Sequence, residues 1–245
     1  MSRTRAQARV RFPSGVQINT SEVLSAKEID LYYGPAHAVR GASIALHRGE
    51  VAAITGQSGS GKSSLLYALA GVLPVVSGEV HFEGRPLAAL DDEELSALRR
   101  DRFGFVFQYG ELLPELTVEE NTALPLRLAG HRKAPALAAA GEVLGRLGLA
   151  DLKERRPSQV SGGQNQRVAV ARALVHRPAV VFADEPTGSL DSANAAAVLK
   201  EFLALARSQG TAVVLVTHDA KVAAQADKRF TMLDGELAPQ GQGQL

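Results

Sequence analysis

A glycine-rich stretch of eight residues constrains this chain more than any other feature: Gly56-Gln57-Ser58-Gly59-Ser60-Gly61-Lys62-Ser63. It fits the pattern G-x-x-x-x-G-K-[ST], whose glycines allow backbone N–H groups to turn inward onto phosphate oxygens. Residues 50–55 before it read as a buried strand, and residues 62–70 read as a helix that ends at Gly71. Because a helix N-terminus carries partial positive charge, this order predicts a phosphate site rather than a flexible Gly/Ser connection.

The pattern also assigns roles to the side chains of the loop. Lys62 is expected to hold the β- and γ-phosphates of ATP, and the Ser63 hydroxyl is expected to bind Mg²⁺. The predicted nucleotide-binding residues of this stretch are Gly56, Ser58, Gly59, Ser60, Gly61, Lys62, Ser63 and Ser64. ATP and Mg²⁺ are therefore the expected ligands of the loop.

Composition indicates one domain around that site. The chain has 245 residues, of which 45% are hydrophobic and 22% charged, and this suits a single α/β domain with a full-sized core. The net charge of +1 gives no reason to expect nucleic acid as a partner, and the absence of cysteine excludes disulfides, zinc–thiolate sites and cysteine catalysis. No apolar run approaches the roughly 18 residues of a membrane helix. We expect a cytoplasmic protein that reaches a membrane only through a partner.

Hydrophobic periodicity predicts an α/β sheet that a helical block interrupts. Residues 1–25 are polar, basic and aperiodic, and they predict a disordered tail. Strands are expected near 29–33, 42–46, 51–54, 79–82, 103–107, 179–183, 211–217 and 229–233, and helices over 91–100, 117–130, 134–147, 161–176, 192–208 and 219–226. Thr117 and Glu120 have the spacing of a capping box. The nucleotide should bind at the carboxyl ends of the core strands.

Two adjacent carboxylates follow the apolar run at residues 180–183. Because side chains alternate along a strand, Asp184 and Glu185 must point in different directions or lie where the strand gives way to a loop. Asp184 is the expected Mg²⁺ ligand, and Glu185 is placed to polarise the water that attacks the γ-phosphate. An acidic turn after an edge strand is the competing interpretation.

A second anion site is predicted at Ser161-Gly162-Gly163-Gln164. Ser161 can cap the following helix, and the two glycines expose its first N–H groups. With the phosphate loop and the Asp-Glu pair, this stretch resembles the LSGGQ signature of ATP-binding-cassette (ABC) transporter ATPases, with Val160 in place of the usual leucine. In that family the signature of one subunit closes over ATP held by the other, so the resemblance implies a head-to-tail homodimer with two shared sites.

The resemblance implies further site residues, one position at a time. Tyr33, with Tyr32 as the competing candidate, resembles the aromatic residue that stacks on adenine. Gln108 resembles the Q-loop glutamine that contacts Mg²⁺ or the lytic water. Asp191, after Ser189, resembles the D-loop aspartate at the dimer interface, and His218 resembles the switch histidine that contacts the γ-phosphate.

The resemblance covers about residues 28–237 and implies a fold: an α/β P-loop NTPase (RecA-like) core with an antiparallel β subdomain and an inserted helical subdomain. The implied nucleotide-binding domain is 26–240, with its core at 26–107 and 178–240 and the helical subdomain at 108–177. Residues 92–126 are similar to the subfamily of macrolide exporters, lipoprotein-releasing complexes and cell-division permeases. A separate transmembrane permease, with this chain peripheral at the inner face of the cell membrane, is therefore implied.

The sequence is also compatible with other functions. An amino-acid importer and a non-transport regulatory module carry the same site motifs. Translation factors with two cassettes and DNA-repair members with an inserted coiled coil do not fit 245 residues with one copy of each motif. The apolar residues Leu112, Leu113, Leu116 and Val118 favour either a groove wall that binds a permease helix or packing inside the helical block.

Overall fold

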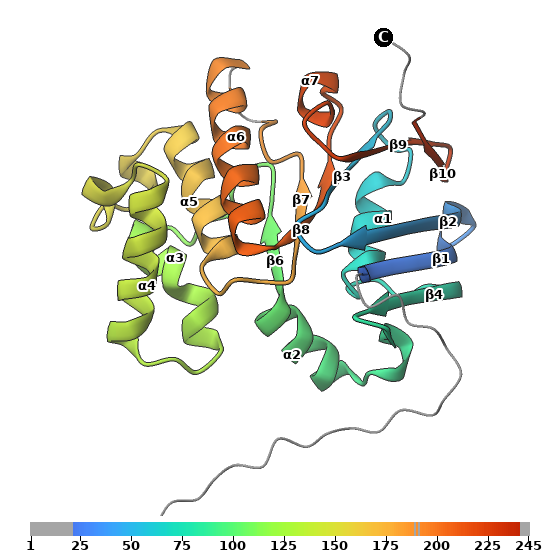
Figure 1. Ribbon diagram of the computed structural model, residues 1–245, viewed down its shortest axis with the longest axis horizontal. Helices are drawn as coiled ribbons and strands as arrows, with labels where there is room; N and C mark the ends of the chain where they lie inside the picture. The colour runs from blue at the N-terminus through green and yellow to red at the C-terminus, as the bar shows by residue number, and fades with distance from the viewer. Residues whose placement is uncertain (1–21, 189, 191, 241–245) are drawn as a thin grey trace, which may run out of the picture.

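Over residues 22–188, 190 and 192–240, which the computed structural model describes, ten strands form one curled sheet (Figure 1). Their order across the sheet is β5-β4-β1-β2-β10-β9-β3-β8-β7-β6. The strands are β1 Glu22–Tyr33, β2 Ala36–His47, β3 Val51–Thr55, β4 Ser77–Phe82, β5 Arg85–Pro86, β6 Phe103–Val106, β7 Val180–Asp184, β8 Ala212–Val216, β9 Lys228–Leu233 and β10 Glu236–Pro239. The sheet therefore has a parallel half, β9-β3-β8-β7-β6, and an antiparallel half, β5-β4-β1-β2.

Helices cover both faces of the parallel half. They are α1 Lys62–Leu69, α2 Asp92–Arg102, α3 Val118–Leu128, α4 Lys133–Arg146, α5 Gly162–Leu174, α6 Ser192–Gln209 and α7 Ala220–Ala223. In β3, Val51 and Ala53 face the core shared with α5, α6 and α7, whereas Ala52 and Ile54 face the core shared with α1. Double burial explains why the central strands are apolar along their whole length.

The antiparallel half begins earlier than the sequence predicts. Strand β1 starts at Glu22, so residues 22–25 belong to the sheet and not to the tail, and the expectation of a tail that extends to residue 25 is wrong at these positions. The register with β2 and with β4 shifts near Glu28, whose φ is 46°. Such bulges interrupt the alternation of apolar and polar residues by which a strand is identified from its sequence. In this strand the regular alternation begins only at Ile29. Residues 1–21 lie outside the described residues.

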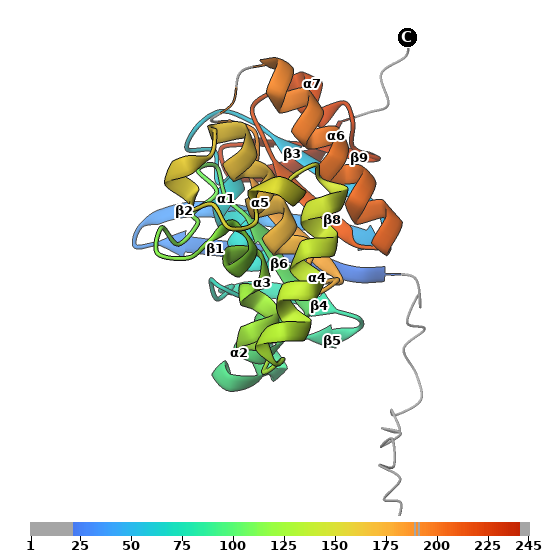
Figure 2. The same cartoon turned by 90° about the vertical axis from the view of Figure 1, so that its left-hand side faces the viewer.

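The predicted helical block is present. Helices α3, α4 and α5 pack together beyond the β6 edge of the sheet, with α3 and α4 foremost in the side view (Figure 2). The Thr117 side chain accepts a hydrogen bond from Glu120 N, and the Glu120 side chain accepts one from Thr117 N, which confirms the capping box. No helix in the described ranges is long and apolar enough to cross a membrane.

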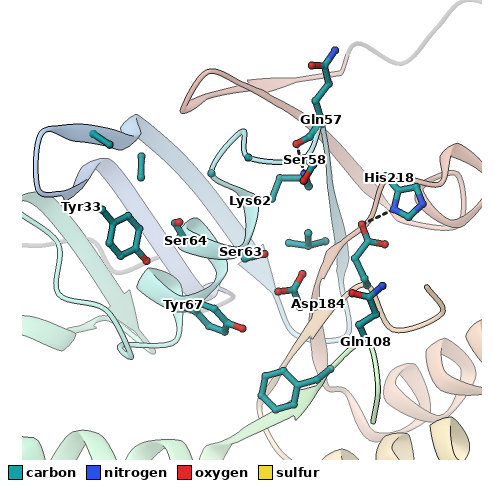
Figure 3. Close-up of a pocket in the computed structure, with 18 of the residues that line it drawn as sticks. Tyr33, Gln57, Ser58, Lys62, Ser63, Ser64, Tyr67, Gln108, Asp184 and His218 are labelled. Carbon is teal, nitrogen blue, oxygen red and sulfur yellow. Dashed lines mark hydrogen bonds and ion pairs between the residues drawn. The ribbon is translucent and has the colours of Figure 1, made fainter. Parts of the chain in front are cut away.

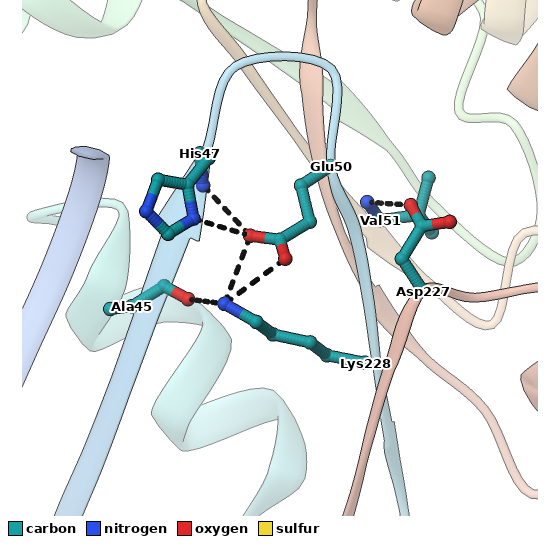
Figure 4. Close-up of polar contacts among 6 residues, drawn as sticks. All are labelled: Ala45, His47, Glu50, Val51, Asp227 and Lys228. Atoms are coloured by element: carbon teal, nitrogen blue, oxygen red, sulfur yellow. Dashed lines mark hydrogen bonds and ion pairs between the residues drawn. The ribbon is translucent and has the colours of Figure 1, made fainter. Parts of the chain in front are cut away.

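A polar network ties the antiparallel half to the core at the start of β3 (Figure 4). The Glu50 carboxylate accepts hydrogen bonds from His47 N at 2.9 Å and from Lys228 Nζ at 3.1 Å, and Lys228 also donates to Ala45 O. Burial would raise the pKa of Glu50, but the bonds from His47 and Lys228 outweigh burial and lower it. The network thus joins the end of β2 to the first residue of β9.

Candidate nucleotide site

Four neighbouring parallel strands each deliver a predicted site residue at their carboxyl end. The phosphate loop follows β3, His218 follows β8, Asp184 and Glu185 end β7, and Gln108 follows β6. Because β3, β8, β7 and β6 are adjacent in the sheet, these residues line one cleft of about 930 Å³ (Figure 3). These residues are spread along the sequence from Gly56 to His218, and the strand order brings them together.

The phosphate loop needs glycine where its backbone passes close to other strands. A Cβ at Gly61, whose φ is 102°, would lie 2.1 Å from the Ala38 carbonyl oxygen, and a Cβ at Gly56 would lie 2.2 Å from the Met232 carbonyl oxygen. Lys62 is buried and donates to Gln57 O at 2.6 Å. The predicted loop residues Gly56, Ser58, Gly59, Gly61, Lys62, Ser63 and Ser64 all line the cleft, whereas Ser60 is buried outside the cleft lining.

The two carboxylates enter the cleft side by side. Asp184 is the last residue of β7, and Glu185 follows it with a φ of 46°, which turns its side chain toward the same cleft. Burial raises the pKa of Asp184, and the Glu185 charge adds to this shift, while a hydrogen bond from Ser63 and the Lys62 charge oppose it.

His218 and Gln108 line the cleft together with Asp184 and Glu185 (Figure 3). His218 Nδ1 lies 2.7 Å from Glu185 Oε1. The Gln108 side chain packs against the backbone of Gly188, where a Cβ would lie only 3.0 Å from Gln108 Nε2. The arrangement brings a basic ring, two carboxylates and an amide to one wall of the cleft, opposite the phosphate loop.

The two candidate tyrosines occupy different environments. Tyr33 lines the cleft, while Tyr32 stacks on the ring of His37 with 4.1 Å between ring centroids. Cross-strand pairing explains the stack, because Tyr32 lies opposite His37 in the β1–β2 ladder. Of the two tyrosines, Tyr33 is therefore the one that lines the cleft.

Some cleft residues were missed from the sequence. Tyr67, Phe107 and Glu111 line the cleft. Tyr67 was detectable in principle, since it lies four residues after Ser63 on the same face of α1. Phe107 and Glu111 flank Gln108 in an irregular segment, and no periodicity there indicates which side chains face the cleft.

The signature residues Ser161, Gly162, Gly163 and Gln164 are not among those that line the cleft. They begin α5, where the Ser161 side chain accepts from Gln164 N and the Gln164 side chain accepts from Ser161 N. The predicted helix cap is thus confirmed. The positions of the D-loop prediction, Ser189 and Asp191, lie outside the described residues.

Comparison with known proteins identifies the family. Residues 39–188 match the model of the ABC transporter family. The chain belongs to that family. It is 46% identical over 226 residues to the lipoprotein-releasing system ATP-binding protein LolD of Bordetella pertussis, which covers 90% of this chain and 97% of that protein. LolD of Novosphingobium aromaticivorans is 45% identical over 199 residues, or 81% of this chain and 89% of that protein.

Solved structures of the same family confirm the fold. A dimeric structure of the cassette MJ0796 bound to ADP and Pi has a TM-score of 0.80 and 34% identity, and it covers 91% of this chain and 100% of that one. A second dimeric structure of MJ0796 has a TM-score of 0.81. This ABC family member is an ATPase subunit of a transporter that acts with a separate membrane component.

Proposed function

We propose that this chain drives a membrane permease of the lipoprotein-releasing kind, coupling ATP hydrolysis to movement of the permease. The observation that carries the proposal is the 46% identity to a LolD protein across 97% of its length. The 226 matched residues make up 90% of this chain, so the similarity extends well beyond the ATP-site motifs. We infer a location at the inner face of the cell membrane, held there by the permease.

We propose that Glu185 is the general base for the attacking water. Its carboxylate lies 2.7 Å from His218, which can hold the carboxylate in place and contact the γ-phosphate. Tyr33 would stack on adenine, while Lys62 and the loop N–H groups would hold the phosphates. Each of these groups lines the same cleft.

Mg²⁺ is assigned to the oxygens of Ser63, Asp184 and Gln108. Hydroxyl, carboxylate and amide oxygens are hard ligands of the kind that Mg²⁺ accepts, and Ser63 already bonds to Asp184. When bound, the metal neutralises charge on the phosphates. This set therefore fits the ion that the phosphate loop implies.

We propose that the functional unit is a homodimer in which Ser161, Gly162, Gly163 and Gln164 contact the partner's ATP. Ser161 and Gly162 are exposed, and the four signature residues lie outside the cleft of their own chain. The similar MJ0796 cassette is dimeric. An exposed helix start with free N–H groups is suited to an anion that another subunit holds.

The permease would dock in the groove between α2, β6 and α3. This groove has a volume of about 310 Å³, and its apolar wall includes Phe105, Leu124, Pro125 and Leu128. Of the four apolar residues expected at a docking surface, Val118 is fully buried and Leu112 packs against the core, and neither Leu113 nor Leu116 lines this groove. Leu128, an exposed leucine beside the groove, replaces them as the permease contact.

A mixing experiment tests the shared sites. Lys62→Ala and Ser161→Arg subunits are each expected to be inactive, but a heterodimer contains one intact composite site and one doubly damaged site. ATPase activity should therefore reappear on mixing, up to about half of the parent rate if sites act independently. If differential tags demonstrate heterodimers and these show no ATPase activity, the shared-site assignment is contradicted.

A further inference from the structure

The segment that carries Gln108 is fastened to helix α5 through its backbone. Gln166 Nε2 donates to Phe107 O at 3.0 Å, and the Arg172 guanidinium donates to Gly110 O and to Glu111 O, both at 2.7 Å. Residues 107–111 thus lie along α5, held at two points that are six residues apart in the helix. A Cβ at Gly110 would also touch Ala169 at 3.5 Å, so the segment packs closely between these points.

One fastening side chain, Gln166, is fully buried, and the other, Arg172, is half-buried. Gln166 is only 2% exposed, and burial lowers the pKa of Arg172 from its ordinary value. Among the described residues Arg172 forms no ion pair, and its hydrogen bonds go to the peptide oxygens of Gly110 and Glu111, while the Glu111 charge raises its pKa against the effect of burial. A guanidinium stays charged and has a planar fork of donors, and charge-assisted bonds of this kind fix two carbonyls in a single orientation.

Helix α5 therefore connects two places in the fold. Its N-terminus carries Ser161 and the signature glycines, and its middle and end hold the segment in which Gln108 reaches the cleft. The helix is continuous over thirteen residues, so a displacement of its N-terminus moves Gln166 and Arg172 with it. The segment must follow or lose three hydrogen bonds.

We propose that Arg172 and Gln166 are positioning residues that set the place of Gln108 according to the position of α5. When the signature of one subunit closes on the ATP that its partner holds, α5 of that subunit moves. The movement brings Gln108 of the same subunit into line with the metal and water of that subunit's own ATP site. The inference rests on the proposed role of Gln108 and on the shared sites. It adds a physical link between the partner's ATP site, which the N-terminus of α5 would contact, and the ATP site of the chain that contains α5.

A double-mutant cycle on basal ATPase activity tests the link. Arg172→Gln removes the charged fork, and we expect kcat to fall at least about tenfold while the Kd for a non-hydrolysable ATP analogue is unchanged. Gln108→Ala alone should also lower kcat. If Arg172 acts through Gln108, the double variant should be no slower than Gln108→Ala. Activity is measured without the permease, because Arg172 also borders the proposed docking groove.

A matched control lies on the same helix. Arg167 pairs with Glu201 of α6 at 2.9 Å and, among the described residues, does not bond to the segment 107–111, so Arg167→Gln removes the same charge from α5 and should keep kcat. Hydrogen exchange should accelerate at residues 108–113 in Arg172→Gln and stay at the parent rate in the control. Arg172→Lys, which keeps the charge but not the fork, should recover part of kcat.

The kcat values of these variants distinguish the role of Gln108 from the positioning role of Arg172 and Gln166. An unchanged kcat in Gln108→Ala would remove the role of Gln108, whereas a slow Gln108→Ala with fully additive effects would overturn the positioning role alone. If Arg172→Gln does not fold, a double-mutant cycle that combines Gln166→Met with Gln108→Ala tests the same positioning role. Methionine keeps the volume of Gln166 but cannot donate the hydrogen bond to Phe107 O. Additivity in that cycle would likewise overturn the inference.

Discussion

At the scale of single residues, the direction of Glu185 is set by its backbone. A strand that continued past Asp184 would send the next side chain to the opposite face, but a φ of 46° redirects Glu185 into the cleft. Glu185 N still donates to Val216 O at 2.9 Å, so the turn remains bonded to β8. The carboxyl end of β7 thus presents two carboxylates to one site.

Replacing Glu185 by Gln should slow ATP hydrolysis by about 10²–10⁴-fold and leave ATP binding intact, because the amide keeps the shape but cannot accept the proton of the attacking water. Phosphate release and a calorimetric titration with ATP measure the two effects. Glu83→Gln is a suitable control, since Glu83 also has a positive φ of 48° but lies outside the cleft. A parent-like rate in Glu185→Gln would remove Glu185 as the base.

At the scale of elements, the network around Glu50 is expected to stabilise the junction of β2, β3 and β9. Glu50→Gln should lower the free energy of unfolding at pH 7 by about 2 kcal/mol, because Lys228 loses its charged partner. Chemical denaturation measures the loss. Glu79→Gln serves as the control because Glu79 lies on an exposed position of β4, where its carboxylate pairs with His81 at 3.5 Å.

This stabilisation should depend on pH with a defined sign. The pKa of Glu50 is lower in the folded chain than the ordinary value of 4.5, so the unfolded state binds more protons at acidic pH. The contribution is therefore fully present above the unfolded pKa and is lost as pH falls through the folded pKa. The difference in stability between the parent and Glu50→Gln should shrink below about pH 4, and a constant difference down to pH 3 would refute the assignment.

Local patterns predicted much of the fold and of the site, and non-local contacts account for what they missed. The capping boxes at Thr117 and Ser161 depend on residues three positions apart, and the strand-end residues depend on short apolar runs. Arg172 could not be assigned, because its partners are backbone oxygens some sixty positions away. Strand β10 was missed for a related reason: its pairing with β9 leaves it exposed, without an apolar pattern.

At the scale of the whole molecule, the docking groove and the ATP cleft are separated by the segment 107–111, which borders both. A permease bound in the groove would therefore contact the same segment that carries Gln108. This arrangement predicts that contacts in the groove affect stimulated hydrolysis without being needed for basal hydrolysis.

Leu128→Glu should preserve folding and basal ATPase activity and abolish stimulation by the permease in reconstituted membranes. Leu128 is 64% exposed and lines the groove, so a charge there should disfavour docking and leave the core intact. Leu233→Glu is a matched control, because Leu233 is 60% exposed and lies on β9, outside the groove. Full stimulation of a folded Leu128→Glu variant would show that the permease binds elsewhere.

The hairpin of β9 and β10 has a consequence for the order of events during synthesis. Gly235 N donates to Ser60 O at 3.1 Å, Thr231 pairs with Thr55, and the Met232 carbonyl oxygen lies against Gly56. The phosphate loop at residues 56–63 is translated well before residues 228–239, which form the hairpin that supports it. ATP bound to the loop therefore cannot assist the nascent chain to fold with these contacts in place until β9 and β10 have left the ribosome.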